Sequence, residues 1–309
     1  MKAVSMGTAN KKIMKGRLKW QRIFLFTMLV IPLMHFCVFY IYMNSRFITM
    51  AFQSRTGTWT LDNFKKFFEA AGRDGDIGIA VKNTILFYLF GQISLPSGLI
   101  ISYFLFKKIR GYKFFRFAFY FPGILAEIVM VTLFKEFVKP WGPVGVIFEN
   151  LGHPFPLEGL FATESATMTI IIYTVWLSLP SGMMLWMGSM TRIPQDVFEA
   201  AKIDGCGTFR ELWSIIIPLI FPTVASMFLI AMTGFLGAGG PILLFTDGRY
   251  GTSTFGFWMF KQVYKGPGGQ SGTDFYGVLS ATGLFFTAAL VPLVFFVRWL
   301  LNKIPSAEY

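Results

Sequence analysis

The sequence predicts an all-α membrane protein with six transmembrane helices. Two properties of the composition support this fold class: 54% of the 309 residues are hydrophobic, and only 14% are charged. An average soluble protein is about 25% charged, so this chain has too few polar groups to cover a surface in water. The high apolar content also excludes disorder for most of the chain, because disordered segments lack apolar side chains.

Six apolar stretches are each long enough to provide the roughly 20 residues that a helix needs to cross the hydrocarbon core. The expected spans cover residues 20–43, 82–106, 114–138, 166–190, 213–236 and 276–301. Together they define a transmembrane domain over residues 20–301, with a basic segment at 1–19 and a tail at 302–309. The first run is longer than the apolar part of a signal peptide and lacks a small-x-small cleavage site, which predicts an uncleaved helix.

The distribution of the net charge of +12 predicts the orientation of the chain. Six spans place both termini on one side, and 17 of the 28 Lys and Arg residues fall on that side. Seven of them lie within residues 2–22 and five within residues 107–116. The positive-inside rule therefore predicts cytoplasmic termini. No basic stripe is interleaved with aromatic residues, so we expect no nucleic-acid binding, and two Cys and two His at these spacings predict no metal site.

The segments expected outside the membrane are long. Residues 61–71 place Phe64, Phe67 and Phe68 on one helical face, with Asp62 or Asn63 as the capping residue. Residues 139–165 and 237–275 are rich in Gly and Pro. The second of these is expected to be either a surface for an external partner or a re-entrant or flexible connection.

The segment between the fourth and fifth spans predicts a short helix on the inner side. Pro194 suits the first turn of a helix. Residues 195–203 then form an amphipathic pattern that Gly205 and Gly207 end, and its apolar residues are Val197, Phe198, Ala201 and Ile203. The sequence Thr-Phe-Arg-Glu at 208–211 has the spacing of a capping box, which predicts the start of the next helix.

Three side chains of this short helix suit contact with another protein. Ala200 and Ala201 have little bulk, so a partner could approach closely. Glu199 offers a carboxylate for a bidentate Arg. These residues alone leave open an interfacial helix without a partner.

The spacing of this segment resembles that of ATP-binding-cassette importer permeases. Their loop reads Glu-Ala-Ala, three residues, Gly, nine residues, Ile-x-Leu-Pro; this chain has Glu199-Ala200-Ala201, then Gly205, then Ile215-Ile216-Ile217-Pro218. Ile217 in place of Leu is the one departure. Ile193-Pro194 and Ile203-Asp204-Gly205 resemble the carbohydrate-uptake branch. Weaker similarity to the family covers residues 61–64 and 83–84, and residues 239–241 and 246–248 resemble the first, maltose-type subunit.

The resemblance implies that the short helix is a cytoplasmic coupling helix that docks on an ATPase subunit. It assigns this role to Glu199, Ala200, Ala201, Asp204, Gly205, Arg210 and Pro218. The chain has no Gly-x4-Gly-Lys-Ser/Thr phosphate loop, so it is expected to be a transporter subunit and not an enzyme. ATP and Mg would be bound by partner chains.

The resemblance also implies the partners and the location. The partners are a second homologous permease subunit, two ATPase subunits, an external solute-binding protein and the lipid bilayer of a bacterial plasma membrane. Alternating access would then move a sugar or oligosaccharide across the membrane. The alternatives are an importer of the same class for a non-sugar solute and an ion-coupled secondary transporter, which would predict inverted repeats with broken helices.

Four residues inside the expected spans are candidates for the translocation path. Glu127 lies near mid-depth of the third span, and an ionisable group there is a functional candidate. Tyr173 and Trp176 share a helical face, and Ser181 follows Pro180, which should bend the helix. Aromatic faces and hydroxyls suit sugar stacking. The other interpretation is structural: pairing of Glu127 across the bundle, and ordinary helix packing for the rest.

Overall fold

The computed structural model describes residues 20–54, 56–73, 75–157, 159–162, 164–264 and 276–304. The described residues are helical, and they contain no strand beyond one isolated bridge between Gln53 and Trp59. The all-α prediction is confirmed for this part of the chain. The predicted basic segment 1–19, the Gly-Pro-Gly-Gly run at 266–269 and most of the tail 302–309 lie outside the described residues.

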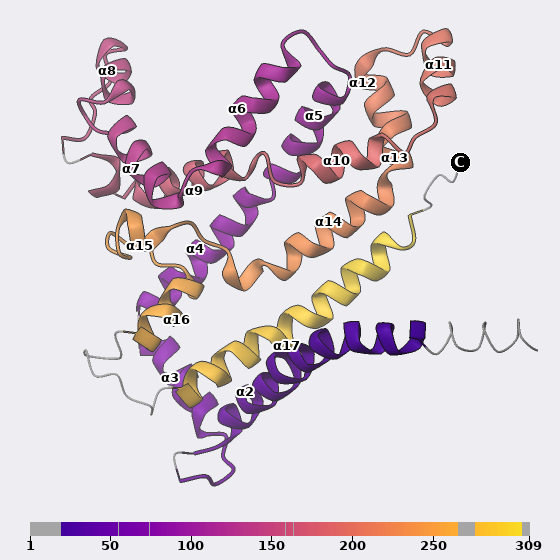
Figure 1. Ribbon diagram of the computed structural model, residues 1–309. Coiled ribbons are helices and arrows are strands. Elements are labelled where there is room, and N and C mark those ends of the chain that lie inside the picture. Colours follow the sequence, from indigo (N-terminus) through magenta and orange to yellow (C-terminus); the bar gives the residue numbers. More distant parts are fainter. Residues whose placement is uncertain are drawn as a thin grey trace, which may run out of the picture. The chain divides into compact units, whose positions relative to one another are not determined.

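The elements follow one another with few long connections (Figure 1). After an α-helix over residues 20–35, the first elements are η1 (Phe36–Tyr42), α2 (Met43–Phe52), α3 (Asp62–Arg73), α4 (Gly75–Gly91), α5 (Ser94–Phe106), α6 (Tyr112–Ile124), α7 (Glu127–Phe137), α8 (Pro143–Asn150), η2 (Leu160–Ala162) and α9 (Ala166–Ser178). The remaining elements are α10 (Met183–Met190), α11 (Gln195–Ile203), α12 (Thr208–Glu211), η3 (Leu212–Ile216), α13 (Ile217–Leu219), α14 (Phe221–Thr233), η4 (Phe235–Gly237), α15 (Ile242–Phe245), α16 (Phe255–Tyr264) and α17 (Tyr276–Leu301).

Four helical stretches of the described chain are long and apolar enough to cross a membrane. They are Trp20–Phe52, Gly75–Phe106, Ala166–Met190 and Tyr276–Leu301, and the number rises to six if each of two bent helix pairs counts as one span. Two of these helices extend beyond the predicted spans. The first continues to Phe52, past the predicted end of the span at residue 43, and the second begins at Gly75, ahead of the predicted start at residue 82.

The predicted third span is not one straight helix. Helices α6 and α7 meet at an angle of 109°, and Leu125 and Ala126 between them have extended backbones. Pro122 and Gly123 come just before the break. Proline removes a backbone hydrogen bond to the residue four positions earlier, and its ring crowds the preceding turn. Pro122 therefore weakens the last turns of the helix, which ends at Ile124.

The predicted fifth span is broken as well, with an angle of 77° between the Thr208–Leu219 and Phe221–Thr233 segments. The break falls at Ile220, between Pro218 and Pro222. Pro222 has no N–H group to donate to the carbonyl of Pro218 four residues earlier. The series of backbone hydrogen bonds along the helix is therefore interrupted at this position.

The chain divides into two compact units, which are described separately. The first comprises residues up to Phe67 together with Tyr276–Leu284. In it, Asn63 does not cap its own helix as predicted. Its amide instead donates to the carbonyls of Met50, Ala51 and Gln53, at 3.2, 3.1 and 2.9 Å. These carbonyls lie at the end of α2 and have no helical partner of their own, so Asn63 closes the preceding helix.

The second unit, residues 68–275 and 285 onward, contains two hydrophobic clusters. The first joins α5, α10 and the start of the fifth span through Leu99, Tyr103, Trp186, Met190, Ile193, Leu212, Ile216 and Ile220. The second joins α4, α7, α9 and α15 through Phe87, Met130, Val131, Ile170, Ile171, Tyr173 and Phe245. Helices α8 and α11 lie at opposite ends of this unit (Figure 1).

Polar side chains of α4 fasten the segment that follows the fifth span. This segment was expected to contact a partner or to form a re-entrant or flexible connection; its described part contains α15 and α16. The amide of Asn83 donates to the carbonyls of Gly251 and Ser253, at 2.6 and 2.8 Å. The hydroxyl of Thr84 accepts from the backbone N–H of Phe255 at 2.8 Å. Both side chains are buried.

Replacing Asn83 by Ala should destabilise the protein, because the carbonyls of Gly251 and Ser253 lose the donor that this buried side chain supplies. Each lost hydrogen bond costs about 0.5–1.5 kcal/mol. Thermal unfolding of the detergent-solubilised chain measures the effect as a lower Tm. Asn44→Ala is the matched control, since the amide of Asn44 is exposed and bonds only within its own helix, to the carbonyl of Tyr40. Equal Tm values for the two variants would contradict the prediction.

Candidate functional site: an interior cavity and an exposed helix

An open cavity of about 510 Å³ lies within the second unit. Its lining comes from the start of α7, from α9 and the turn after it, and from the segment after η4. The lining residues are Glu127, Tyr173, Thr174, Leu177, Ser178, Ser181, Gly239, Gly240 and Pro241. A volume of this size is within the range of small-molecule pockets.

The structure brings three of the four predicted path residues to this cavity. Glu127 is the first residue of α7, directly after the 109° break, and not mid-way along a continuous helix as predicted. Its carboxylate is favoured at the positive end of the helix dipole. Ser181 lies in the turn between α9 and α10, and Tyr173 comes from α9.

Trp176 does not line the cavity. Its ring stacks on Phe134, with centroids 6.4 Å apart, and its side chain is exposed. Tyr173 packs between Phe134 and Phe245, at 5.0 Å from each. The shared face of Tyr173 and Trp176 thus contacts other rings, as the structural interpretation expects.

The hydroxyl of Tyr173 is a polar group inside this apolar cluster. Tyr173 is fully buried, and its oxygen has no hydrogen-bond partner among the described residues. A buried hydroxyl without a partner is costly. Its oxygen has almost no accessible surface, so a molecule bound in the cavity can reach it only after neighbouring side chains move.

Gly240 allows the backbone of the segment after η4 to approach α9. A Cβ at this position would lie 2.5 Å from the Thr174 hydroxyl and 2.8 Å from the side chain of Ile170. Only glycine permits that approach. Thr174, Ser178 and the Gly-Gly-Pro segment were not predicted as cavity residues. The spacing of residues 174, 177, 178 and 181 along one helical face was the available signal.

The predicted short helix is present as α11, over Gln195–Ile203. Val197 and Phe198 pack against the first hydrophobic cluster, and Ala201 is 5% exposed. Ala201 therefore contacts its own chain and not a free surface. Glu199 and Ala200 are exposed.

Two large apolar side chains extend the free face of this helix. Ile203 is 86% exposed and Phe209 is 67% exposed. The amphipathic pattern of residues 195–203 predicts that Ile203 shares the apolar face with Val197 and Ala201. The structure instead leaves Ile203 on the outside, and Asp204 and Arg210 are exposed too.

Gly205 ends α11 in a Schellman motif. The N–H of Cys206 donates to the carbonyl of Ala201 at 2.9 Å, and the N–H of Gly205 to that of Lys202 at 3.2 Å. Gly205 has φ +67°, which L side chains rarely adopt. The chain then reverses into α12, whose N-cap is Gly207.

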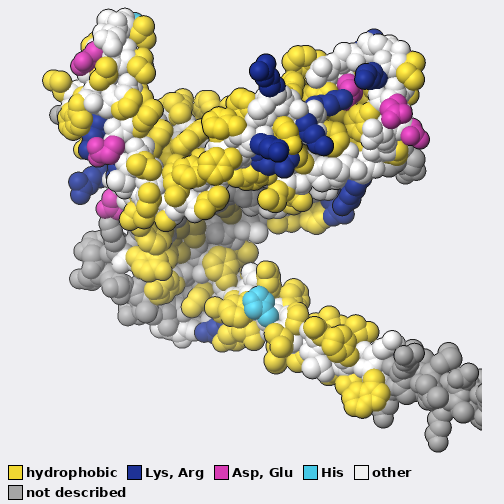
Figure 2. Space-filling model, turned by 45° about the horizontal axis from the view of Figure 1, so that its top comes forward, with side chains coloured by type: hydrophobic (Ala, Val, Ile, Leu, Met, Phe, Trp, Pro, Cys, Tyr) yellow, Lys and Arg dark blue, Asp and Glu magenta, His cyan; other side chains and the backbone are white. Residues whose placement is uncertain are grey.

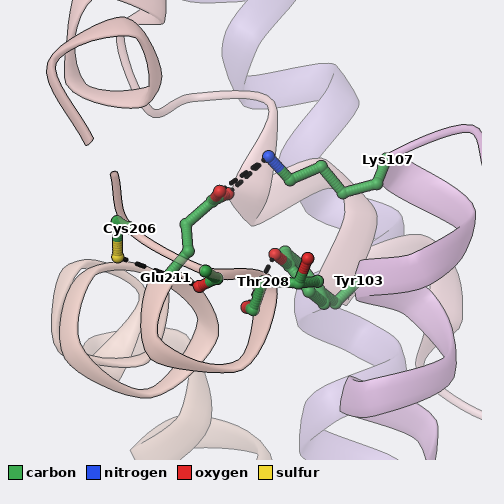
Figure 3. Close-up of polar contacts among 6 residues, drawn as sticks. Tyr103, Lys107, Cys206, Thr208 and Glu211 are labelled. Atoms are coloured by element: carbon green, nitrogen blue, oxygen red, sulfur yellow. Dashed lines mark hydrogen bonds and ion pairs between the residues drawn. The ribbon is translucent and has the colours of Figure 1, made fainter. Parts of the chain in front are cut away.

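The predicted capping box at 208–211 is absent. Helix α12 starts at Thr208 as expected, but no side chain caps it. Glu211 turns away from the helix start and pairs with Lys107: the Lys107 Nζ lies 2.6 Å from Oε1 and 2.8 Å from Oε2 (Figure 3). No local pattern indicates this pair, because the two residues are 104 positions apart.

Lys135 also has a specific partner. Its ammonium donates to the carbonyl of Leu244 at the end of α15 and lies 5.7 Å from the Phe245 ring centroid. The sequence alone requires no specific partner for Lys135, because a lysine near the end of a span can extend its ammonium to the membrane interface. The structure shows instead that Lys135 closes a short helix.

Basic side chains gather at the end of the second unit that carries α11, while hydrophobic side chains cover its middle (Figure 2). The exposed basic residues of the α5–α6 connection are Lys107, Lys108 and Arg110, and Lys113 follows in the first turn of α6. This distribution is typical of a membrane protein whose inner end carries the positive charge.

Comparison with known proteins gives a consistent result. The sequence profile of the family described as "Binding-protein-dependent transport system inner membrane component" matches residues 19–305. The chain is 27% identical to the multiple sugar-binding transport system permease protein MsmF of Streptococcus mutans, over 77% of this chain and 84% of that protein. It is 26% identical to the maltose/maltodextrin transport system permease protein MalF of Escherichia coli K12, over 72% of this chain and 44% of that protein.

A solved structure shares the fold. A chain of a bacterial alginate ABC transporter, crystallised with an alginate pentasaccharide-bound periplasmic protein, aligns with a TM-score of 0.74 at 18% identity. The alignment covers 90% of this chain and 93% of that chain.

Replacing Gly205 by Ala should weaken the end of α11, because the left-handed conformation costs an L residue about 1–2 kcal/mol. No atom within 4 Å blocks a Cβ there, so the effect isolates the backbone conformation. Gly207→Ala is the matched control: it too has open space, but its φ is −71°. Hydrogen exchange of the α11 amides should be faster in Gly205→Ala and unchanged in Gly207→Ala. Equal exchange in both variants would be the contrary result.

Proposed function

We propose that this chain, which belongs to the family of binding-protein-dependent transport system inner membrane components, forms the membrane-spanning part of an ATP-driven sugar or oligosaccharide importer. The observation that carries the proposal is the family match over residues 19–305. The relatives MsmF and MalF, named for sugar and for maltodextrin transport, support a carbohydrate as the solute. The chain itself is a permease subunit and not an enzyme.

The proposed topology has six spans and both termini in the cytoplasm of a bacterium, with the chain in the inner membrane. Each bent helix pair then counts as one span. The basic connection between α5 and α6 and the helix α11 lie on the inner side, and α8 lies on the outer side. The gathering of basic residues at the α11 end supports this orientation.

In the proposed mechanism α11 is the coupling helix. Glu199 pairs with a basic residue of an ATPase subunit, while Ala200, Ile203 and Phe209 contact its surface. Two such ATPases bind ATP and Mg, and their closure moves α11 so that the permease alternates between inward-open and outward-open states. A second, homologous permease subunit and an external solute-binding protein complete the importer. The exposure of Glu199, Ala200 and Ile203 supports this role.

We further propose that the cavity at Glu127 is part of the solute path. Hydroxyls of Tyr173, Ser178 and Ser181 offer hydrogen bonds to a sugar. Among the described lining residues Glu127 is the charged side chain, and none is Lys or Arg. A negatively charged solute would meet an unfavourable like charge, so the site suits an uncharged or cationic sugar.

Reversing the charge at Glu199 tests the coupling role. In Glu199→Arg, co-purification with the candidate ATPase should fall, because a basic partner would then face a like charge. Asp196→Arg, which reverses another exposed acidic residue on α11, is the control and should retain more of the assembly. Normal assembly and transport by Glu199→Arg would rule out this coupling role.

Single changes in the cavity test the solute path. Glu127→Ala, Tyr173→Phe and Ser181→Ala should each reduce uptake, while co-purification with the ATPase stays normal. Each lost hydrogen bond to the solute corresponds to about 0.5–1.5 kcal/mol, or about 2- to 13-fold in the uptake constant. Thr233→Ala, a hydroxyl change outside this cavity, should leave uptake unchanged. Full uptake by all three cavity variants would remove this cavity from the path.

A further inference from the structure

We propose that Lys107 and Glu211 are positioning residues, forming a joint that makes α11 move together with α5. This inference rests on the proposed role of α11 in coupling. Lys107 directly follows the last residue of α5, and Glu211 is the last residue of α12. The Lys107 Nζ lies within 2.8 Å of both carboxylate oxygens of Glu211 (Figure 3). The Glu211 side chain is 9% exposed and the Lys107 side chain 34% exposed.

A second polar contact acts at the same place. Tyr103, one turn earlier on α5, is fully buried and donates its hydroxyl to the backbone carbonyl of Thr208 at 3.0 Å. Thr208 is the first residue of α12. The end of α5 is therefore bonded to both ends of α12, through a neutral hydrogen bond and through a charged pair.

The same turn of α5 also holds α11. The Lys107 Nζ lies 5.3 Å from the ring centroid of Phe198, on α11, and the rings of Phe106 and Phe198 are 5.8 Å apart. Behind them, Val197 and Phe198 pack against the cluster that contains Tyr103 and Leu212. Lys107 thus contacts α11 and α12 at once, on the two sides of the reversal at Gly205.

A role in net stability does not account for this pair. Desolvation of two charges offsets much of their attraction, and a pair of packed apolar residues is often at least as stable. What this ion pair adds is geometry, because Oε2 of Glu211 accepts a hydrogen bond from the Lys107 ammonium while Oε1 lies in close ion-pair contact with the same group. An unpaired Glu211 would be a buried charge, so states in which α12 separates from α5 are disfavoured.

Two other ion pairs are local: Lys65 with Asp62, and Lys139 with Glu136, join residues three positions apart. Exposed pairs of this kind contribute little to stability. They provide a matched control for the loss of one charge.

The test measures a distance in the assembled importer, with its ATPase and second permease subunits present in nanodiscs. Spin labels are placed at Lys202→Cys on α11 and at Arg110→Cys after α5, both exposed, in a chain whose own cysteines are Ser. We expect the distance between the labels to be the same without nucleotide and with ATP plus vanadate. In Glu211→Gln it should shift or broaden when ATP and vanadate are added.

Two further variants separate a joint from a general structural role. The exchange Lys107→Glu with Glu211→Lys should restore the constant distance, which a merely destabilised chain would not do. Glu136→Gln, the control, should behave as the original chain. Glu211→Gln should still co-purify with the ATPase, since the exposed face of α11 is unchanged.

Three outcomes would count against these ideas, and they are distinguishable. An unchanged, narrow distance in Glu211→Gln overturns the joint and leaves the importer function intact. A distance that changes with ATP in the original chain overturns it too, because α11 then moves separately from α5. If no ATPase binds the original chain, the proposed function fails, and the joint fails with it.

Discussion

The organisation of this protein depends on the rule that backbone polar groups in lipid must be satisfied by the protein itself. Regular helices meet this rule internally, but this chain interrupts its helices at Leu125–Ala126, after Ser178 and at Ile220. Irregular backbone at membrane depth is tolerated where it is buried in protein or lines a cavity. Glu127 and Ser181 follow the first two of these breaks, Gly240 lies in the irregular segment after η4, and all three line the same cavity. Irregular backbone and the cavity thus occur together in this part of the structure.

The chain has few charged side chains, and two of them make specific contacts between helices. Lys135 closes α15 through the carbonyl of Leu244, and Lys107 joins α5 to α12 through Glu211. Buried neutral groups act in the same way: Asn63 closes α2, and Asn83 fastens the segment at 251–253. Each of these side chains satisfies backbone or side-chain groups that helix geometry leaves without a partner.

Much of the fold could be predicted from local pattern, because apolar runs of sufficient length are a direct consequence of membrane thickness. The existence of the helices, the extent of α11 and the reversal at Gly205 follow from residues close together in the chain. The prediction was wrong where distant residues decide. Glu211 has the correct spacing for a capping box, yet it pairs with Lys107, and Ile203 faces outward although its pattern placed it inward.

The sequence by itself determined that the chain is a helical membrane protein, and its loop spacing indicated the family. These features depend on composition and on short-range spacing, which the physics of the bilayer and of helix ends makes readable. Only the tertiary structure decided which polar residues meet. It placed Glu127 and Tyr173 at one cavity, left Trp176 outside it, and brought Lys107 to Glu211. Such contacts depend on the angles at which broken helices continue, and those angles are set by packing between segments far apart in the chain.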